Sequence, residues 1–314
     1  MNVLVTGGTG FIGSNLIPKL LLAGHKTVLL IRRTSDLINL RSSSDSPLLK
    51  LYDAEREELN DVLRREKVNV VIHLATFYRK QHDARDIDDM VESNIAFPTR
   101  LLEAMINQKV KYFINTGTFF EYKLDFSVSD RVTENNEIRP YNLYASTKAS
   151  FENILKYYVH KKGLTGLTLR LFAPYGMYDK PYKVIPLMIR SALDGSNLEL
   201  STNGHQKWDY VFAGDISDAF VAAIDIILAG KIEYEAINIG SGCALSLREV
   251  AELIESVLHR KLQIKWGQKT EELNNVLADI QKAKEILRWS PKTPIRDGLE
   301  ITAKWIRETY KVSR

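Results

Sequence analysis

Over its first 172 residues, the chain alternates short apolar runs with longer segments in which apolar residues recur every three or four positions. The run at residues 3–5 predicts a buried strand, and the helix behind it is predicted from Leu16, Ile17, Leu20 and Leu21. Later patterns predict a strand, a helix and a strand, at 112–116, 144–162 and 167–172. Strands that alternate with helices in this way predict an α/β fold with a doubly wound parallel sheet.

After residue 173, the segments become shorter and turns become more frequent, which predicts a second, smaller α/β lobe. We expect residues 1–172, together with about 211–240, to form the large domain. The smaller lobe is then expected to comprise residues 173–210 and 241–314.

Three glycines fill the turn between the first predicted strand and helix. Gly7 permits a tight turn, Gly10 lets the backbone approach a pyrophosphate, and Gly13 lets the helix pack closely on the strand. The N-terminus of the helix adds free N–H groups and the positive end of a dipole, both of which favour phosphate. The turn therefore predicts a dinucleotide site; the alternative is a glycine-rich turn without a ligand.

A second motif lies at the start of the predicted helix 144–162. Tyr144 and Lys148 are four residues apart, so both side chains lie on one face of the helix. A cation close to a phenol favours the phenolate and so assists proton transfer near neutral pH. We therefore expect Tyr144 to act as an acid/base group beside Lys148.

Together, the glycine turn and the Tyr-x-x-x-Lys pair resemble those of the extended short-chain dehydrogenase/reductases that act on nucleotide sugars, and the resemblance covers nearly the whole chain. It implies a Rossmann domain that binds NAD(P) and a smaller lobe that binds the substrate. The residues that we assign to the cofactor on this basis, besides Tyr144 and Lys148, are Gly7, Thr9, Gly10, Phe11, Ile12, Gly13, Arg32, Arg33, Ser35, Asp53, Ala54, Leu74, Ala75, Thr76, Asn94, Thr116 and Phe172. Those that we assign to the substrate are Thr118, Phe119, Phe120, Ala173, Ile185, Arg190 and Lys207.

The choice of cofactor depends on the residues that follow the second predicted strand. A site selective for NAD places a carboxylate there for the ribose 2′-hydroxyl, whereas this chain has Arg32 and Arg33, with Ser35 close by. Guanidinium groups suit a 2′-phosphate because they form charge-assisted hydrogen bonds with it. The sequence therefore favours NADP(H) over NAD(H); the alternative is an exposed basic turn with Asp36 as counterion.

The family's third catalytic group is a Ser or Thr four residues before a tyrosine, and Thr118 stands at that distance from Tyr122. The family's 4,6-dehydratases carry acidic residues directly after it, where this chain has Phe119 and Phe120. A phenyl ring cannot transfer protons, so the sequence argues against dehydration. Glu121 comes one position later and should point elsewhere in an extended segment.

Two reactions remain, reduction of a 4-keto nucleotide sugar by NADPH and 4-epimerisation through transient oxidation. Net reduction draws on NADPH, whereas the family's epimerases retain their cofactor, commonly NAD, so Arg32 and Arg33 favour the 4-ketoreductase. A weaker likeness to the cytidine-diphosphate abequose and paratose synthases, which reduce 4-keto-3,6-dideoxy sugars, points the same way. A non-catalytic relative that senses NADP(H) is a further alternative, although such proteins usually lose the tyrosine or the lysine.

Two departures from the family bear on the substrate. Ala173 stands where the family often has Asn, and Trp208 stands where it has the arginine that binds the diphosphate. A sugar diphosphate would then need other cations, for which Lys207 and Arg190 are the candidates.

Composition limits the possible partners. Lys and Arg number 43 against 39 Asp and Glu, without a run of five like charges, so we expect no nucleic-acid partner. The apolar runs are too short to span a membrane, no signal peptide precedes the first strand, and the single cysteine, Cys243, suits a reducing cytoplasm. We expect no metal site. The resemblance implies a homodimer that pairs through the helices at 91–106 and 144–162.

Overall fold

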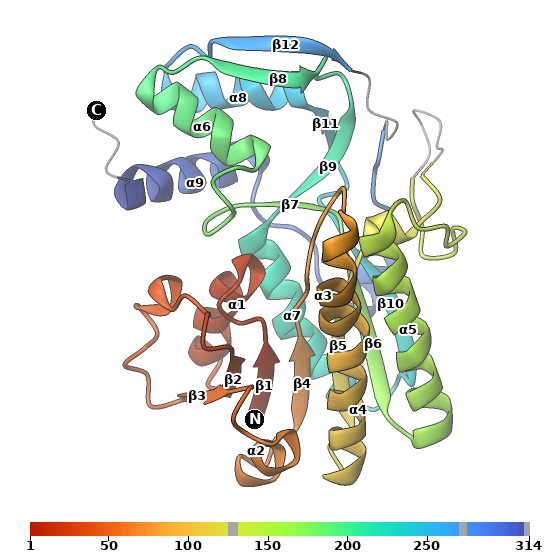
Figure 1. Cartoon of the computed structure of the whole chain (residues 1–314). Helices are drawn as coiled ribbons and strands as arrows, with labels where there is room; N and C mark the ends of the chain where they lie inside the picture. The colour runs from red at the N-terminus through yellow and green to blue at the C-terminus, as the bar shows by residue number, and fades with distance from the viewer. Residues whose placement is uncertain (125–130, 270–274, 311–314) are drawn as a thin grey trace.

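The computed structural model describes residues 1–124, 131–269 and 275–310. A seven-stranded sheet forms the centre of the lower lobe in Figure 1, and its strands lie in the order β10-β6-β5-β4-β1-β2-β3. The bounds of these strands are β1 Asn2–Thr6, β2 Lys26–Ile31, β3 Leu49–Asp53, β4 Val70–His73, β5 Tyr112–Thr118, β6 Thr165–Leu171 and β10 Tyr234–Ile239. The neighbouring strands pair in parallel, with Val5 of β1 opposite both Leu29 and Ile72. The predicted doubly wound parallel sheet is confirmed.

Helices cover both faces of this sheet, which explains why its strands are almost continuously apolar. One face is covered by α1 Phe11–Leu22 and α7 Ala213–Leu228. The other is covered by α2 Leu59–Arg65, α4 Phe97–Asn107 and α5 Leu143–Lys162. The short helix α3 Ile87–Val91 runs into α4 through the π-helical turn η3 Glu92–Ala96. In the described part of the chain, no helix has both the length and the apolar character needed to cross a membrane.

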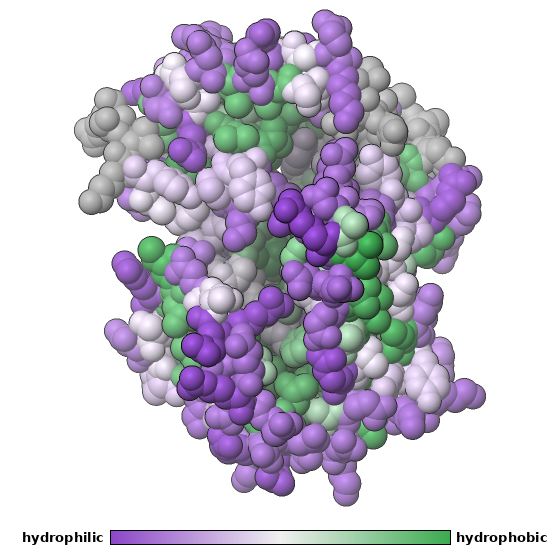
Figure 2. Space-filling view, in the orientation of Figure 1, coloured by the Kyte–Doolittle hydropathy of each residue, from purple (hydrophilic) through white to green (hydrophobic). Residues whose placement is uncertain are grey.

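The upper lobe contains two small sheets, in the strand orders β11-β9-β7 and β12-β8. Its strands are β7 Ala173–Tyr175, β8 Leu198–Thr202, β9 Lys207–Phe212, β11 Ala244–Ser246 and β12 Ile264–Lys269. Its helices are α6 Val184–Asp194, α8 Leu247–Leu258 and α9 Ile295–Tyr310. On the face shown in Figure 2, the surface is hollowed between the two lobes, with hydrophobic residues in the depth of the hollow and hydrophilic residues along its rim.

One segment of the C-terminal part packs on the lower lobe, although the sequence places all of 241–314 in the smaller one. The π-helical turn η5 Ala283–Leu287 contacts α7 and β10. The indole Nε1 of Trp289 donates to the backbone oxygen of Asp215 at 3.0 Å, and Asp215 also accepts from the N–H of Thr293 at 2.9 Å. The apolar face of this turn and the Trp289 ring are buried in the core around α7.

Local signals define the ends of α5, the helix that carries the Tyr-x-x-x-Lys pair. Asn142 is its N-cap, and the side-chain oxygen accepts the N–H of Ala145 at 2.9 Å. Gly163 ends the helix in the left-handed conformation, with φ of 75°. The Asn142 amide also donates to the backbone oxygen of Lys80 at 3.1 Å, so the cap holds the loop after β4 against the start of α5.

The Asn142 cap can be tested directly. Replacing Asn142 by Ala removes the acceptor for the Ala145 N–H, and the free energy of unfolding in urea should fall by about 1 kcal/mol. Asn142→Ser is the matched control because it restores a capping oxygen without the amide that reaches Lys80. Equal stability of the Ala and Ser variants would show that the cap contributes nothing.

Candidate active site

The glycine turn has the geometry that the sequence predicts. Gly7 has φ of +70°, and a Cβ there would lie 2.6 Å from the backbone nitrogen of Ala75. A Cβ on Gly13 would lie 2.5 Å from the Cα of Gly8, so α1 approaches the turn closely only because residue 13 lacks a side chain. A Cβ on Gly10, the N-cap of α1, would meet only one backbone oxygen, at 3.2 Å. The turn is therefore open at Gly10, where the helix N-terminus faces outward.

The segment after β4 borders this turn and is tied to the catalytic helix. Leu74 to Thr76 follow β4, and the Ala75 N–H donates to the Thr6 hydroxyl at 3.3 Å. Asn94 is buried; its side-chain oxygen accepts from the Thr76 hydroxyl at 3.0 Å, and its amide donates to the Thr147 hydroxyl of α5 at 3.0 Å. These contacts lie at the carboxyl ends of the strands, where the sheet order changes direction between β1 and β4. Ligands of open α/β sheets bind at such a position.

Arg32 and Arg33 are exposed just after β2. The backbone N–H of Arg32 donates to the Ser35 hydroxyl at 2.9 Å, and its guanidinium reaches the Ser93 hydroxyl at 3.4 Å. The carboxylate of Asp36 accepts the N–H of Ile38.

At the end of β3, Asp53 accepts the N–H of Glu55 at 2.9 Å and forms an ion pair with Arg56 at 3.5 Å. The Ala54 N–H donates to the backbone oxygen of Ile31 at 2.8 Å, which joins this turn to β2. Asp53 therefore shapes the turn at the edge of the sheet.

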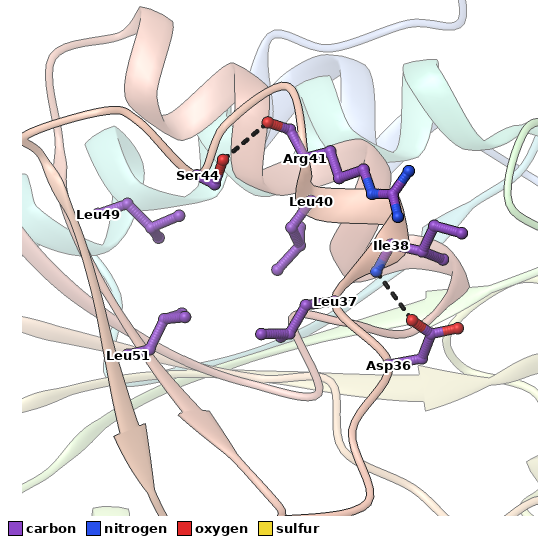
Figure 3. A pocket seen from close by; sticks show the side chains of 8 residues that line it. All are labelled: Asp36, Leu37, Ile38, Leu40, Arg41, Ser44, Leu49 and Leu51. Carbon is purple, nitrogen blue, oxygen red and sulfur yellow. Dashed lines mark hydrogen bonds between the residues drawn. The ribbon is translucent and has the colours of Figure 1, made fainter.

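A cavity of about 380 Å³ lies beside β3, at the edge of the large sheet. Its walls include Leu37, Leu40, Leu49 and Leu51, whose side chains point toward one another in Figure 3. None of its lining residues belongs to the glycine turn or packs around Tyr144. We assign this cavity no part in the chemistry described below.

The segment after β5 differs from the sequence expectation for Glu121. Phe119–Glu121 forms the 3-10 turn η4, which begins at Thr118. The Thr118 hydroxyl accepts the Phe120 N–H at 3.3 Å, and the Glu121 carboxylate turns back to accept the Thr118 N–H at 2.7 Å. The expectation of an extended segment is therefore wrong. The available signal was the Thr-x-x-Glu spacing, which is a capping box.

Glu121 joins a buried group of charges beneath α5. One of its carboxylate oxygens lies 3.7 Å from the guanidinium of Arg170, which also forms two hydrogen bonds with Glu152, at 3.2 and 2.5 Å. Burial raises the pKa of Glu121, and the negative charge of Glu152 raises it further, while the charges of Arg170 and Lys148 lower it. Burial raises the pKa of Glu152, but the charges and hydrogen bonds of Arg170 and Lys156 together lower it below its ordinary value. An ionised Glu152–Arg170 pair therefore lies next to a carboxyl that binds its proton tightly.

Tyr144 lies in the first turn of α5, with 8% of its surface exposed. Burial raises the pKa of its phenol; the Glu121 carboxyl and Tyr78 raise it further, while a hydrogen bond with Thr76 lowers it. The sequence predicts the opposite direction, through the charge of Lys148. The structure does not bear out that direction, because desolvation by burial has the largest effect on the pKa of Tyr144.

Lys148 is almost completely buried, with 2% of its surface exposed. Burial lowers the pKa of its ammonium, and the carboxylates of Glu121 and Glu152 raise it. Burial lowers the pKa of the His73 imidazole, and the charge of Lys148 lowers it further by a smaller amount. Within the described residues, the ammonium has no hydrogen bond or ion pair, so its donors remain available to a ligand.

The structure brings most of the predicted substrate residues together in one buried cluster. Its members are Thr118, Phe119, Phe120, Tyr144, Phe172, Ala173 and Ile185. Trp208 completes the cluster, with ring centroids 5.8 Å from Phe119 and 6.1 Å from Phe120, and Phe119 also stacks on Phe172 at 5.5 Å. Thr116 lies to one side, where its hydroxyl donates to the backbone oxygen of His73 at 2.9 Å.

Lys207 and Arg190, the two cations expected for the substrate, lie outside this cluster. Side chains alternate along β9, so Lys207 is exposed on the opposite face from Trp208, where its charge acts on Glu249. The guanidinium of Arg190 lies 5.1 Å from the ring centroid of Tyr310.

The cations near the cluster are instead Lys80 and Lys183, which the sequence analysis does not single out. The Lys183 ammonium lies 4.1 Å from the ring centroid of Tyr78, whose ring meets that of Tyr144 edge-on at 4.8 Å. The Lys80 ammonium lies 5.6 Å from the Trp208 ring. Their meeting depends on the tertiary fold, since they are about a hundred residues apart in the chain.

A hydroxyl, a phenol and an ammonium thus lie at the carboxyl edge of the sheet, beside a turn that is open to a phosphate. Such an arrangement can transfer a proton to or from an oxygen atom next to a bound dinucleotide. A search of residues 1–124, 131–269 and 275–310 finds no group of three or more His, Cys, Asp or Glu residues that could hold a metal ion.

The chain is similar to known proteins in both sequence and structure. Residues 3–240 match the model of the NAD dependent epimerase/dehydratase family. The chain is 28% identical to UDP-glucose 4-epimerase of Rhizobium meliloti, covering 97% of this chain and 96% of that protein. It is 25% identical to CDP-abequose synthase of Salmonella muenchen, covering 95% of each. The crystal structure of UDP-glucuronic acid 4-epimerase from Bacillus cereus, in complex with UDP-glucuronic acid and NAD, is similar with a TM-score of 0.87 and 27% identity, covering 99% of this chain and all of that one.

The raised pKa of Glu121 makes a prediction about stability. Because the folded protein binds this proton more tightly than the unfolded chain, the wild type should lose stability relative to Glu121→Gln as pH rises from about 5 to 7. A raise of one pKa unit corresponds to about 1.4 kcal/mol, and we expect a change of at least that size in the free energy of unfolding in urea. Gln keeps the acceptor for the Thr118 N–H. Exposed Glu300→Gln is the control, and a pH-independent difference for Glu121→Gln would contradict the assignment.

Proposed function

The chain belongs to the NAD dependent epimerase/dehydratase family, and from this premise we propose that it reduces the 4-keto group of a nucleotide sugar with NADPH. The observation that carries the proposal is that Thr118 begins a turn that packs on α5, the helix that carries Tyr144 and Lys148, with Phe119 and Phe120 where a dehydratase has acids. The likeness to CDP-abequose synthase supports reduction.

The residues around the glycine turn fit a nicotinamide dinucleotide. The turn is open at Gly10, so a pyrophosphate can approach the backbone and the N-terminus of α1 there. The segment at Leu74 to Thr76 borders the space next to the turn, and the ammonium of Lys148 has donors for the nicotinamide ribose, as the family resemblance implies. When bound, the cofactor supplies the hydride.

The phenol of Tyr144 is the proposed acid. Reduction of a ketone leaves negative charge on the oxygen, which must take up a proton. A phenol is protonated at neutral pH, the form that can donate, and burial raises the pKa of Tyr144 further, so transfer of its proton depends on stabilisation of the phenolate. The Thr118 hydroxyl is placed to hydrogen-bond the same oxygen, and the Lys148 ammonium offsets the charge that the phenol acquires.

The aromatic cluster beside Tyr144 supports a substrate of reduced polarity. Phe119, Phe120, Phe172 and Trp208 pack their rings together there, and hydroxyl groups of a hexose placed against them would lose water without gaining hydrogen bonds. A 4-keto-6-deoxy sugar, which carries a methyl group in place of the hydroxymethyl group and a ketone in place of the C4 hydroxyl, avoids part of that cost.

The second candidate is a nucleotide-sugar 4-epimerase. The relatives from Rhizobium meliloti and Bacillus cereus carry that name, and the Bacillus cereus structure contains NAD. The same tyrosine, threonine and lysine would serve, with Tyr144 first accepting a proton. The exposed Arg32 and Arg33 support NADP(H) and therefore the reductase. A cytoplasmic homodimer that pairs through α4 and α5 completes the proposal, and a non-catalytic NADP(H) sensor is the outcome if no turnover is found.

Cofactor preference can be tested at Arg32 and Arg33. Replacing both by Ala should weaken NADPH binding by about tenfold or more, because charge-assisted hydrogen bonds to the 2′-phosphate are lost, while NADH binding changes little. Fluorescence titration of both cofactors measures this. Arg41→Ala, which removes an exposed arginine in the following segment, is the control. Equal losses of affinity for the two cofactors, or a wild-type preference for NADH, would show that the arginines belong to an exposed turn and do not bind the 2′-phosphate.

The reaction itself can be tested by the fate of the hydride. With 4-keto-6-deoxy sugar nucleotides and NADPH deuterated at the transferable position, deuterium should appear at C4 of the product, with one NADPH oxidised per turnover. Tyr144→Phe should lower the rate by about 10²–10⁴-fold while NADPH still binds. Conversion of a 4-hydroxy sugar nucleotide to its C4 epimer without net oxidation of NADPH would establish the epimerase instead. Tight NADPH binding without any turnover would indicate the sensor.

A further inference from the structure

Two lysines from distant parts of the chain stand at the edge of the catalytic cluster. Lys80 lies in the loop after β4, and its backbone oxygen accepts the amide of Asn142, the N-cap of α5. Lys183 is the residue before α6, and its N–H donates to the backbone oxygen of Lys180 at 2.9 Å. Both side chains are half-buried, so each position is defined by packing on one side and open to solvent on the other.

Aromatic rings connect both ammonium groups to the catalytic residues. The Lys183 ammonium lies over the Tyr78 ring at 4.1 Å, and that ring contacts Tyr144. The Lys80 ammonium faces the Trp208 ring at 5.6 Å, and Trp208 packs on Phe119. Each cation is therefore separated from a residue of the cluster by one aromatic ring.

The two cations repel each other. The charge of Lys80 lowers the pKa of Lys183, in addition to the larger effect of burial, and only the Asp179 carboxylate raises it. Burial raises the pKa of Asp179 to about 6, so its carboxylate is charged at neutral pH and offsets part of the positive charge of Lys183. An oxyanion between the lysines would relieve the repulsion and form charge-assisted hydrogen bonds with both.

The neighbouring substitutions point to the same place. Trp208 stands where the family has a diphosphate-binding arginine, and Lys207 and Arg190 lie away from the hollow. The chain therefore has Trp208 in place of the expected arginine on β9, and two other cations lie nearby, Lys80 over the Trp208 ring and Lys183 over the Tyr78 ring. We propose that Lys80 and Lys183 bind an oxyanion of the nucleotide-sugar substrate, either its diphosphate or a carboxylate on the sugar. This inference rests on the proposed function.

The test is a binding measurement by titration calorimetry on the NADP⁺-loaded protein. The probes are the glucose diphosphates of uridine, cytidine, thymidine and guanosine, together with UDP-glucuronic acid. Lys80→Met and Lys183→Met keep the apolar stem and remove the charge, and each should weaken binding about tenfold or more. Lys183→Arg should restore most of the affinity. Lys180→Met, an exposed lysine in the same loop without a ring contact, should bind like the wild type.

The probes separate the two sources of the oxyanion. Losses for the glucose nucleotides and the uronate alike assign the lysines to the diphosphate, whereas a loss confined to UDP-glucuronic acid assigns them to a carboxylate. Wild-type affinity of both Met variants for every probe that the wild type binds would overturn the inference and leave the reductase proposal intact. If the wild type binds none of the probes, the inference is overturned, and the hydride-transfer assay with 4-keto-6-deoxy sugar nucleotides decides the proposed function separately. If binding depends on the two lysines but no hydride is transferred, only the proposed reaction is overturned and the oxyanion site stands.

Discussion

The guanidinium of Arg170 holds the catalytic end of the sheet together. From β6 it bonds Glu152 of α5 twice and donates to the hydroxyl of Tyr122 at 2.8 Å, and that hydroxyl donates to Asn238 of β10 at 2.7 Å. Four elements thus meet at one buried cation. Removing one member of such a buried pair leaves the other charge without compensation, which typically costs about 3–5 kcal/mol. The position of α5 on the sheet, and with it the position of Tyr144, depends on this contact.

The same contact determines the charge around the catalytic helix. Since Arg170 and Glu152 neutralise each other, the remaining buried groups beneath α5 are Lys148 and Glu121, and burial shifts both toward their neutral forms. A bound ligand that carries charge can therefore change the proton occupancy of this pair at low energetic cost. The phenol of Tyr144 lies above the pair and remains protonated because its own desolvation dominates.

Local pattern was sufficient to predict the fold but only part of the site. The predicted family and the predicted parallel sheet are both confirmed. They could be predicted because the apolar runs, the glycine spacing and the Tyr-x-x-x-Lys pair are patterns of residues close together in the sequence. The alternation of side chains along a strand gives the wrong position for Glu121, because the strand ends at Thr118. The hydroxyl of Thr118 caps a 3-10 turn there. Lys80 and Lys183 could not be found from the sequence, since nothing local indicates that two loops from different lobes meet over Tyr78 and Trp208.

The division of charge between the buried interior and the partly exposed lysines follows from desolvation. In the interior, where an unpaired ion would lose several kcal/mol of hydration, Arg170 has a carboxylate partner at hydrogen-bond distance, and the rings of the cluster around Tyr144 carry no charge. Lys80 and Lys183 are only half-buried and keep contact with water, so two like charges can lie near each other at moderate cost. A ligand whose reacting end is uncharged and whose far end is anionic matches this distribution of charge. Its uncharged end suits the buried rings, and its anion suits the lysines. Reversing such a ligand would bury its anion among rings and take it away from the two lysines, so the charge distribution favours one orientation of what binds.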